Sequence, residues 1–435
     1  MPIQRVHARE VLDSRGHPTV EVEVHCDGGV VGSAIVPAGA STGQAEACEL
    51  RDAEPLRYDG RGVRRAVENV ARVLGPAIIG CDPREQESVD AVLIELDGTP
   101  QKSRLGGNAL LGVSLAVAHA AAACDKIPLY QHIRRLIGEA SADHAEANAG
   151  DNVKAVRPFG RMPLPMVNMI SGGLHAGGNL DFQDFLIQPV GAPDYPTGLE
   201  WIVRVYRRLG ELLSQAGFEG RLVGDEGGYG PRLASNRQAA EFVVRAIEAA
   251  RLRPVEDVTL ALDVASTHFF DGSHYRLAAT GDARLTSDEM IDQLAALVDE
   301  FPIDSIEDGL AEDDWPGWQR LTARLGKRVR LVGDDLFTTN QRRLARGLEL
   351  SAGNAVLIKV NQIGTLTETL QSMHLAGQHG WWRVVSARSG ETEDSTIADL
   401  AVGAAGEQIK IGSIVRGERL AKYNRLLRIA EELER

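Results

Sequence analysis

The chain has 435 residues, a length that allows two or more domains and a large hydrophobic core. Hydrophobic residues make up 43% of the chain and charged residues 25%, which is the balance of a folded globular protein. The formal net charge of −14 argues against nucleic acid or an anionic membrane surface as the main partner. It does not exclude an anionic substrate, because a bound metal ion inverts the local field.

The cysteines and the N-terminus indicate a reducing compartment. All 4 cysteines lie in the first third of the chain and form no Cys-X-X-Cys pair, so we expect buried thiols and neither a disulfide framework nor a zinc site. The first residues, MPIQRVHAREVLDSRG, contain no apolar signal segment, and no stretch approaches 18 uninterrupted apolar residues, about the length of a membrane span. We therefore expect a cytoplasmic protein with no membrane partner.

The N-terminal part alternates as β-strands do over residues 3–36, with the valines of TVEVEVHC on one face. The two glycines at 28–29 predict a hairpin turn before a return strand. Helices are predicted over 62–75 and 106–124, and the second is so rich in Ala, Leu and Val that it should be buried. These patterns predict an α+β domain over residues 1–137.

Residues 138–160 are rich in Ala, Asp, Asn and Gly without a steady period, which predicts an exposed linker or loop. From MPLPMVNMI onward, short apolar strands alternate with helices until the chain ends in a charged amphipathic helix. This rhythm predicts a catalytic (β/α) barrel over residues 161–435.

Residues with chemical function stand at the ends of successive apolar strands in this second region. They are Asp263, Glu307, Asp334, Lys359, Arg388 with Ser389, and Lys410. Most neighbours in this series are separated by roughly 25 residues, the length of one strand, one helix and two loops. Because barrel enzymes carry their active sites at the C-terminal ends of the strands, we expect these side chains to converge.

The three carboxylates in this series predict a magnesium site, since Mg²⁺ prefers oxygen ligands. A single Asp at such a position is equally well explained as a helix N-cap, but three at successive strand ends favour a metal. Lys359 ends the apolar strand NAVLIKV. There we expect desolvation and nearby cations to release its proton easily, which makes it a candidate base, with a structural salt bridge as the equal alternative.

Three further motifs add candidate groups. The turn VGDEGGYGP at 223–231 carries two adjacent acids, one of which could be held protonated. The loops PAGASTG and SGGLHAGG consist of small residues and are either lids or ordinary connections, and His175 stands among the glycines of the second. Arg388 and Ser389, in SARSGETED, offer donors to a phosphate or carboxylate.

Taken together, these residues resemble the enolase family, the magnesium-dependent phosphopyruvate hydratases. The resemblance covers nearly the whole chain and includes DSRGHPTVEVEV, PAGASTG, VGDEGGYGP, SIEDGLAEDDW, LVGDDLFTTN, LIKVNQIGTLTETL and SGETEDSTIADLAVG. It implies an α+β capping domain followed by an enolase-type (β/α)8 barrel. It also implies two Mg²⁺ ions per site, the second arriving with a small phosphorylated or phosphonylated substrate, and a homodimer or higher homo-oligomer.

The resemblance implies roles for individual residues. Lys359 would remove the C2 proton of the substrate, and Glu226 would help the C3 hydroxyl to leave. The residues implied to bind magnesium are Asp263, Glu307, Asp334 and, for the second ion, Ser41. The residues implied to bind substrate are His175, Asp184, Arg388, Ser389 and Lys410.

Several positions depart from the family pattern. The family's SHRSGETED is SARSGETED here, so Ala387 replaces a histidine and leaves space beside the anion-binding pair. The family's QEF is QDF here, so Asp184 replaces a glutamate. Its side chain is shorter by one carbon–carbon bond, about 1.5 Å, which draws the carboxylate back toward the backbone. A smaller departure places Ser171 where the family has Asn, and ASTHFF at 265–270 is also unusual.

Three interpretations follow from this pattern. The first is an enolase-type lyase acting on 2-phosphoglycerate. The second is a specialised paralogue that still forms an enolpyruvate, such as a carboxyphosphonoenolpyruvate synthase of phosphonate or phosphinate antibiotic biosynthesis, whose larger phosphorus group would use the space at Ala387. The third is a non-enzymatic binding or structural protein. Retention of Lys359 and the three carboxylates favours an enzyme.

Overall fold

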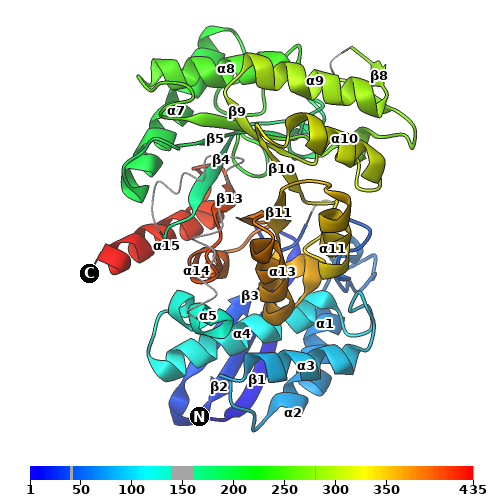
Figure 1. The fold of residues 1–435 in the computed structure, drawn as a ribbon. Helices are drawn as coiled ribbons and strands as arrows, with labels where there is room; N and C mark the ends of the chain where they lie inside the picture. The colour runs from blue at the N-terminus through cyan, green and yellow to red at the C-terminus, as the bar shows by residue number, and fades with distance from the viewer. Residues whose placement is uncertain (40–42, 139–160, 280, 435) are drawn as a thin grey trace.

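The computed structural model describes residues 1–39, 43–138, 161–279 and 281–434. An N-terminal α+β domain lies against a closed eight-stranded barrel, so the predicted fold class is confirmed (Figure 1). Ser41 and most of the predicted linker, residues 139–160, lie outside the described residues.

The chain begins with a three-stranded antiparallel sheet. Its strands, in spatial order, are β1 (Ile3–Leu12), β2 (Pro18–Cys26) and β3 (Val31–Ile35). A 3₁₀ turn, Asp27–Gly29, joins β2 to β3, as the two glycines predicted. Val20, Val22 and Val24 are fully buried, which confirms that they share the inner face.

Helices complete the N-terminal domain. They are α1 (Arg64–Asn69), a π-helical turn (Val70–Leu74), α2 (Gly75–Ile78), α3 (Gln86–Asp97), α4 (Gly107–Asp125) and α5 (Leu129–Ile137), with a 3₁₀ turn at Tyr58–Gly60. Helix α4 makes the closest packing against the sheet, so close that a Cβ on Gly32 would lie 2.1 Å from the backbone nitrogen of Ala120. It is long and apolar enough to cross a membrane, but 89% of that apolar window is buried inside the protein.

Eight strands close the barrel. In spatial order they are β4 (Leu164–Ser171), β5 (Asp184–Gln188), β6 (Thr259–Asp263), β9 (Ile303–Glu307), β10 (Arg330–Gly333), β11 (Ala355–Ile358), β12 (Trp382–Ser386) and β13 (Gln408–Gly412). Strand β5 runs antiparallel to both neighbours, while the other adjacent pairs are parallel. A short loop with a 3₁₀ turn, Gly173–Ala176, joins β4 to β5. The βα rhythm predicted from β4 onward is therefore broken at its start, because β4 leads to the antiparallel β5 with no α-helix between them, and helices follow the strands from β5 onward.

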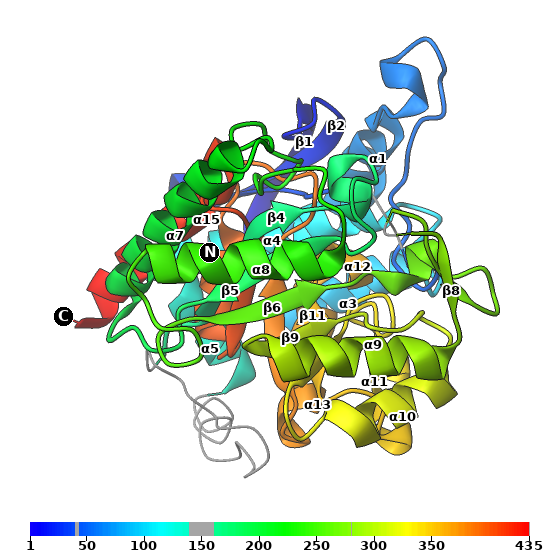
Figure 2. The ribbon, with the colours of Figure 1, turned by 90° about the horizontal axis from the view of Figure 1, so that it is seen from above.

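Helices surround the barrel. They are α7 (Tyr195–Gln215), α8 (Asn236–Ala249), α9 (Ser287–Glu300), α10 (Trp315–Leu325), α11 (Gln341–Leu350), α12 (Val360–Ile363), α13 (Leu366–Gln378), α14 (Thr396–Gly403) and α15 (Gly417–Glu434). A 3₁₀ turn, η5 (Ser266–Phe269), and a hairpin of β7 (Tyr275–Leu277) and β8 (Ala283–Leu285) follow β6. Helices α8 and α9 lie on the side far from the N-terminal domain, whereas α13 and α14 contact it (Figures 1 and 2).

The N-terminal domain reaches the C-terminal ends of the barrel strands. Ala38 and Gly390 form a short antiparallel bridge, with both N–O distances 2.9 Å. Glu46 forms an ion pair of 3.0 Å with Arg388, which follows β12. These contacts place Ala38 and Glu46 of the N-terminal domain against residues that follow β12, at the end of the barrel where the predicted site residues lie.

Candidate active site

The structure brings the predicted carboxylates to neighbouring strand ends. Asp263 is the last residue of β6 and Glu307 the last of β9, and the two are paired in register. Asp334 follows β10 directly. All three side chains are almost completely buried in a polar pocket at the C-terminal end of the barrel, or directly beside it.

Two lysines neutralise these carboxylates. The Nζ of Lys410 lies 2.6 Å from Asp263 and 2.7 Å from Glu307. The Nζ of Lys359 donates a hydrogen bond to Asp334. Burial, and then the charge of Asp263, raise the pKa of Glu307 well above its usual range. The three carboxylates therefore cannot all be charged without cations near them.

The donor set fits the magnesium implied by the resemblance. Asp263, Glu307 and Asp334 present carboxylate oxygens, the ligands that hard divalent cations prefer. The ammonium groups of Lys359 and Lys410 already occupy cation positions beside them. The residues present are thus suited to hold a divalent cation.

Lys359 differs from the prediction in one respect. We expected its pKa to be lowered by burial and nearby cations. Burial does act in that direction, but the ion pair with Asp334 outweighs it and raises the pKa of Lys359. The sequence could not show this, because the pairing joins residues that follow two different strands.

The predicted anion-binding residues are held from several sides. Arg388 donates to Glu46 at 3.0 Å and to the side-chain oxygen of Asn361 at 2.8 Å. The backbone carbonyls of Arg388 and Ser389 accept hydrogen bonds from the fully buried Arg419, at 2.6 and 2.7 Å. Contacts within the protein therefore hold Arg388 and Ser389 in position without a ligand.

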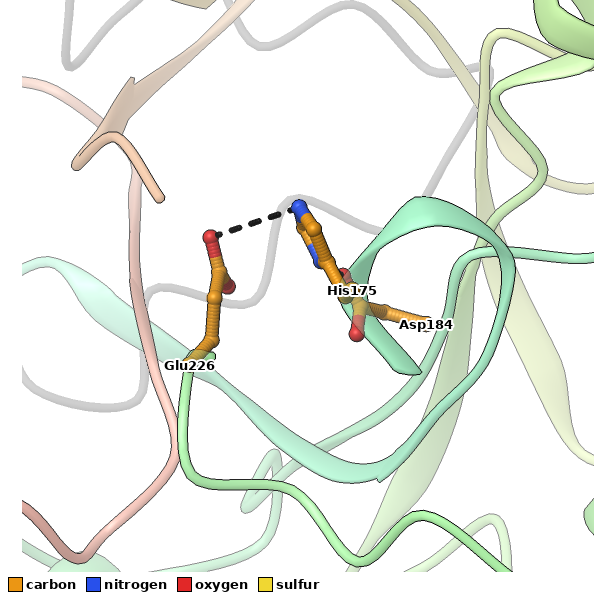
Figure 3. A group of neighbouring side chains, drawn as sticks. All are labelled: His175, Asp184 and Glu226. Carbon is orange, nitrogen blue, oxygen red and sulfur yellow. Dashed lines mark hydrogen bonds and ion pairs between the residues drawn. The ribbon is translucent and has the colours of Figure 1, made fainter. Parts of the chain in front are cut away.

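A second group of predicted residues lies across the pocket. The Nδ1 of His175 is 2.8 Å from Asp184, and its Nε2 is 3.9 Å from Glu226 (Figure 3). Burial alone would lower the pKa of His175, but Asp184 and Glu226 outweigh it and raise the pKa to about 9. The ring is therefore held between two carboxylates as a cation at neutral pH.

Asp184 is fully buried and lies behind the pocket wall rather than lining the pocket. One carboxylate oxygen accepts from His175, and the other accepts from Asn168 and, at 3.2 Å, from Ser171. Two positions that depart from the family, Ser171 and Asp184, thus contact each other. The turn at 223–231 packs against them, since a Cβ on Gly228 would lie 2.8 Å from the hydroxyl of Ser171. The retracted carboxylate and the small side chain fit together.

Several residues of the site were not predicted from the sequence. Asp308 and Asp335 lie with Asp334, and their ligand atoms are within 4.8 Å of one another. The carboxylate of Asp308 accepts hydrogen bonds from the backbone nitrogens of Asp334 and Asp335, at 2.9 and 2.8 Å. Asp308 therefore caps the C-terminal end of β10. The motifs SIED and RLVGDD contain both acids, but the strand-end pattern predicts a role for only the first acid of each motif, Glu307 and Asp334.

Three further residues come from outside the strand-end motifs. Gln183 donates a hydrogen bond of 3.2 Å to Asp263. Both Gln183 and His268, which lies on η5, line the pocket. Gln362 donates to Asp334 at 2.8 Å. The unusual segment ASTHFF was the only sequence signal for His268.

Two family models match the chain. The model described as Enolase, N-terminal domain matches residues 3–133, and the model described as Enolase, C-terminal TIM barrel domain matches residues 160–435. The two matched regions correspond to the α+β domain and the barrel of the structure. The chain therefore belongs to the enolase family.

Proposed function

We propose that the protein is a magnesium-dependent carbon–oxygen lyase. It would remove the C2 proton of 2-phosphoglycerate, or of a close phosphorus-containing analogue, and form an enolpyruvate product. The observation that carries this proposal is the meeting of buried carboxylates, two lysines and an arginine–serine pair in one polar pocket. Membership of the enolase family supports the same reaction class.

Asp263, Glu307 and Asp334 would hold the magnesium, and Ser41 would join a second ion. When bound, the metal would neutralise the substrate carboxylate and so make the C2 proton more acidic. Lys359 would take that proton as a neutral amine, which requires its pairing with Asp334 to relax. Burial and the charges of Arg388 and Lys410 act in that direction, because each lowers the pKa of Lys359.

The second half of the reaction would belong to the opposite wall of the pocket. Glu226 would give a proton to the leaving C3 hydroxyl. The Nε2 of His175 lies 3.9 Å from the carboxylate of Glu226. Arg388 and Ser389 would hold the phosphorus-bearing group, since an arginine fork matches its oxygens. Lys410 would balance the substrate carboxylate.

A specialised paralogue, such as a carboxyphosphonoenolpyruvate synthase, is the second candidate, and Ala387 is the observation that favours it. Ala387 lines the pocket directly before Arg388, and its methyl group leaves space where the family has an imidazole ring. A larger substituent on phosphorus would use that space.

A panel of substrates distinguishes these candidates. Purified protein with Mg²⁺ would be assayed for enolpyruvate formation from 2-phosphoglycerate and from carboxyphosphono analogues. Turnover of 2-phosphoglycerate at the higher kcat/KM supports the first candidate, and preference for the phosphonate supports the second. No turnover of either substrate would reject the lyase and leave the interpretation as a binding or structural protein.

A further inference from the structure

Five basic side chains line the pocket, and four of them are paired with acids. The pairs are His175 with Asp184, Lys359 with Asp334, Arg388 with Glu46, and Lys410 with Asp263 and Glu307. Of these five side chains, all of which belong to the described part of the chain, only the ring of His268 makes no hydrogen bond or ion pair. His268 is exposed to solvent at the mouth of the pocket, so its donor is available to a ligand.

The backbone around His268 is fixed on both sides. The hydroxyl of Thr267 accepts a hydrogen bond of 3.0 Å from the backbone nitrogen of Glu312. The ring of Phe269 stacks on Phe182, with centroids 6.5 Å apart. His268 is therefore presented by an anchored turn, which reduces the entropy lost when its side chain binds a ligand.

His268 faces the anion-binding residues across the barrel. It follows β6, whereas Ala387, Arg388 and Ser389 follow β12, and these two strands are four positions apart in the closed ring of eight. Ala387 offers no hydrogen-bond donor on its own side. A substrate held by Arg388 and Ser389 would thus have the unpaired imidazole of His268 on the opposite wall of the pocket.

We propose that His268 is a substrate-contacting residue, whose imidazole donates a hydrogen bond to an anionic oxygen of the bound substrate. This inference rests on the proposed function, because it requires an anionic substrate between the two walls. Because the ring is not paired with the protein, the contact forms without breaking an ion pair. Hydrogen bonds to charged groups are the stronger kind, and loss of this one should weaken binding about tenfold.

The test measures equilibrium binding by calorimetry in the presence of Mg²⁺. The ligands are 2-phosphoglycolate, which lacks the leaving hydroxyl and cannot be dehydrated, and a bulkier carboxyphosphono analogue that also lacks this hydroxyl. We expect His268→Ala to weaken binding of the tighter ligand about tenfold. His268→Gln keeps a donor and should stay within about threefold of wild type, while His268→Glu should bind more weakly than His268→Ala.

His274→Ala is the matched control, because His274 lies between η5 and β7 without lining the pocket and contacts the hydroxyl of Ser273. It should bind as wild type does. If wild type binds and His268→Ala binds equally tightly, the His268 proposal is wrong and the proposed function stands. If wild type binds neither ligand, the proposed function fails and the His268 proposal fails with it.

Discussion

The Nδ1 of His175 lies 2.8 Å from the Oδ2 of Asp184, and this contact aims the other ring nitrogen at Glu226. Asp184 thus acts on the pocket through His175 rather than by facing it. We predict that Asp184→Asn lowers kcat about 100-fold with little change in KM, because the ring loses the charge that orients it. Steady-state kinetics on the preferred substrate measures both constants.

Asp181→Asn is the control for this change. Asp181 lies three residues before Asp184, and its carboxylate accepts a hydrogen bond from the backbone nitrogen of Ala279. It should leave kcat unchanged. A mainly raised KM in Asp184→Asn would instead mean that Asp184 binds substrate directly.

The pairing of His175 also predicts a pH dependence of stability. Its pKa is raised from 6.5 to about 9 in the folded protein, so the stabilisation is complete below about pH 6.5 and is lost as the pH rises through 9. We expect the free energy of unfolding of wild type to fall between pH 6.5 and 9.5 by more than that of His175→Gln. Urea unfolding at several pH values measures the difference, and parallel curves for the two proteins would contradict it.

Restoring the family residues should change the substrate preference. We expect Ala387→His with Asp184→Glu to raise dehydration of 2-phosphoglycerate and to lower activity on a bulkier phosphonate. The reason is that the new ring refills the space the larger group needs, and one catalytic donor typically contributes about 10²–10³ in rate. Parallel assays of the two substrates test this. If wild type already dehydrates 2-phosphoglycerate at a normal enolase rate, the specialised-paralogue interpretation is wrong.

The Asp184→Glu change has a structural consequence of its own. Asp184 is fully buried and already contacts Asn168, Ser171 and His175, so one more methylene has no free space. We expect Asp184→Glu alone to lower stability by about 1–3 kcal/mol, as overpacking of a buried site does. Urea unfolding measures this, and stability equal to that of wild type would mean that the wall adapts easily.

The metal site predicts a loss of binding on removal of one ligand. Asp263→Ala should abolish Mg²⁺ binding at the strand ends, and Asp263→Asn should do the same while keeping the shape of the side chain. Calorimetry measures the affinity, with Asp282→Asn as a control because Asp282 is exposed and paired with Arg276. Unchanged Mg²⁺ affinity in both Asp263 variants would reject the assignment.

The sequence predicted the strand-end residues well because each lies at the end of a short apolar run, which is a local pattern. It could not predict what these residues contact. Arg388 pairs with Glu46, which is distant in the chain, and Lys359 pairs with an acid that follows another strand. The antiparallel β5 was missed for a similar reason, since its apolar residues look the same in either direction.

Exchange of the C2 hydrogen tests the central claim most directly, because it follows proton removal without requiring the hydroxyl to leave. Wild-type protein with Mg²⁺ should exchange the C2 hydrogen of 2-phosphoglycerate, or of the preferred phosphonate, with deuterium from the solvent. Lys359→Ala and Lys359→Gln should abolish this exchange, while the exposed Lys327→Ala should keep it. Deuterium incorporation at the wild-type rate in both Lys359 variants would show that another residue is the base and would contradict the proposed mechanism.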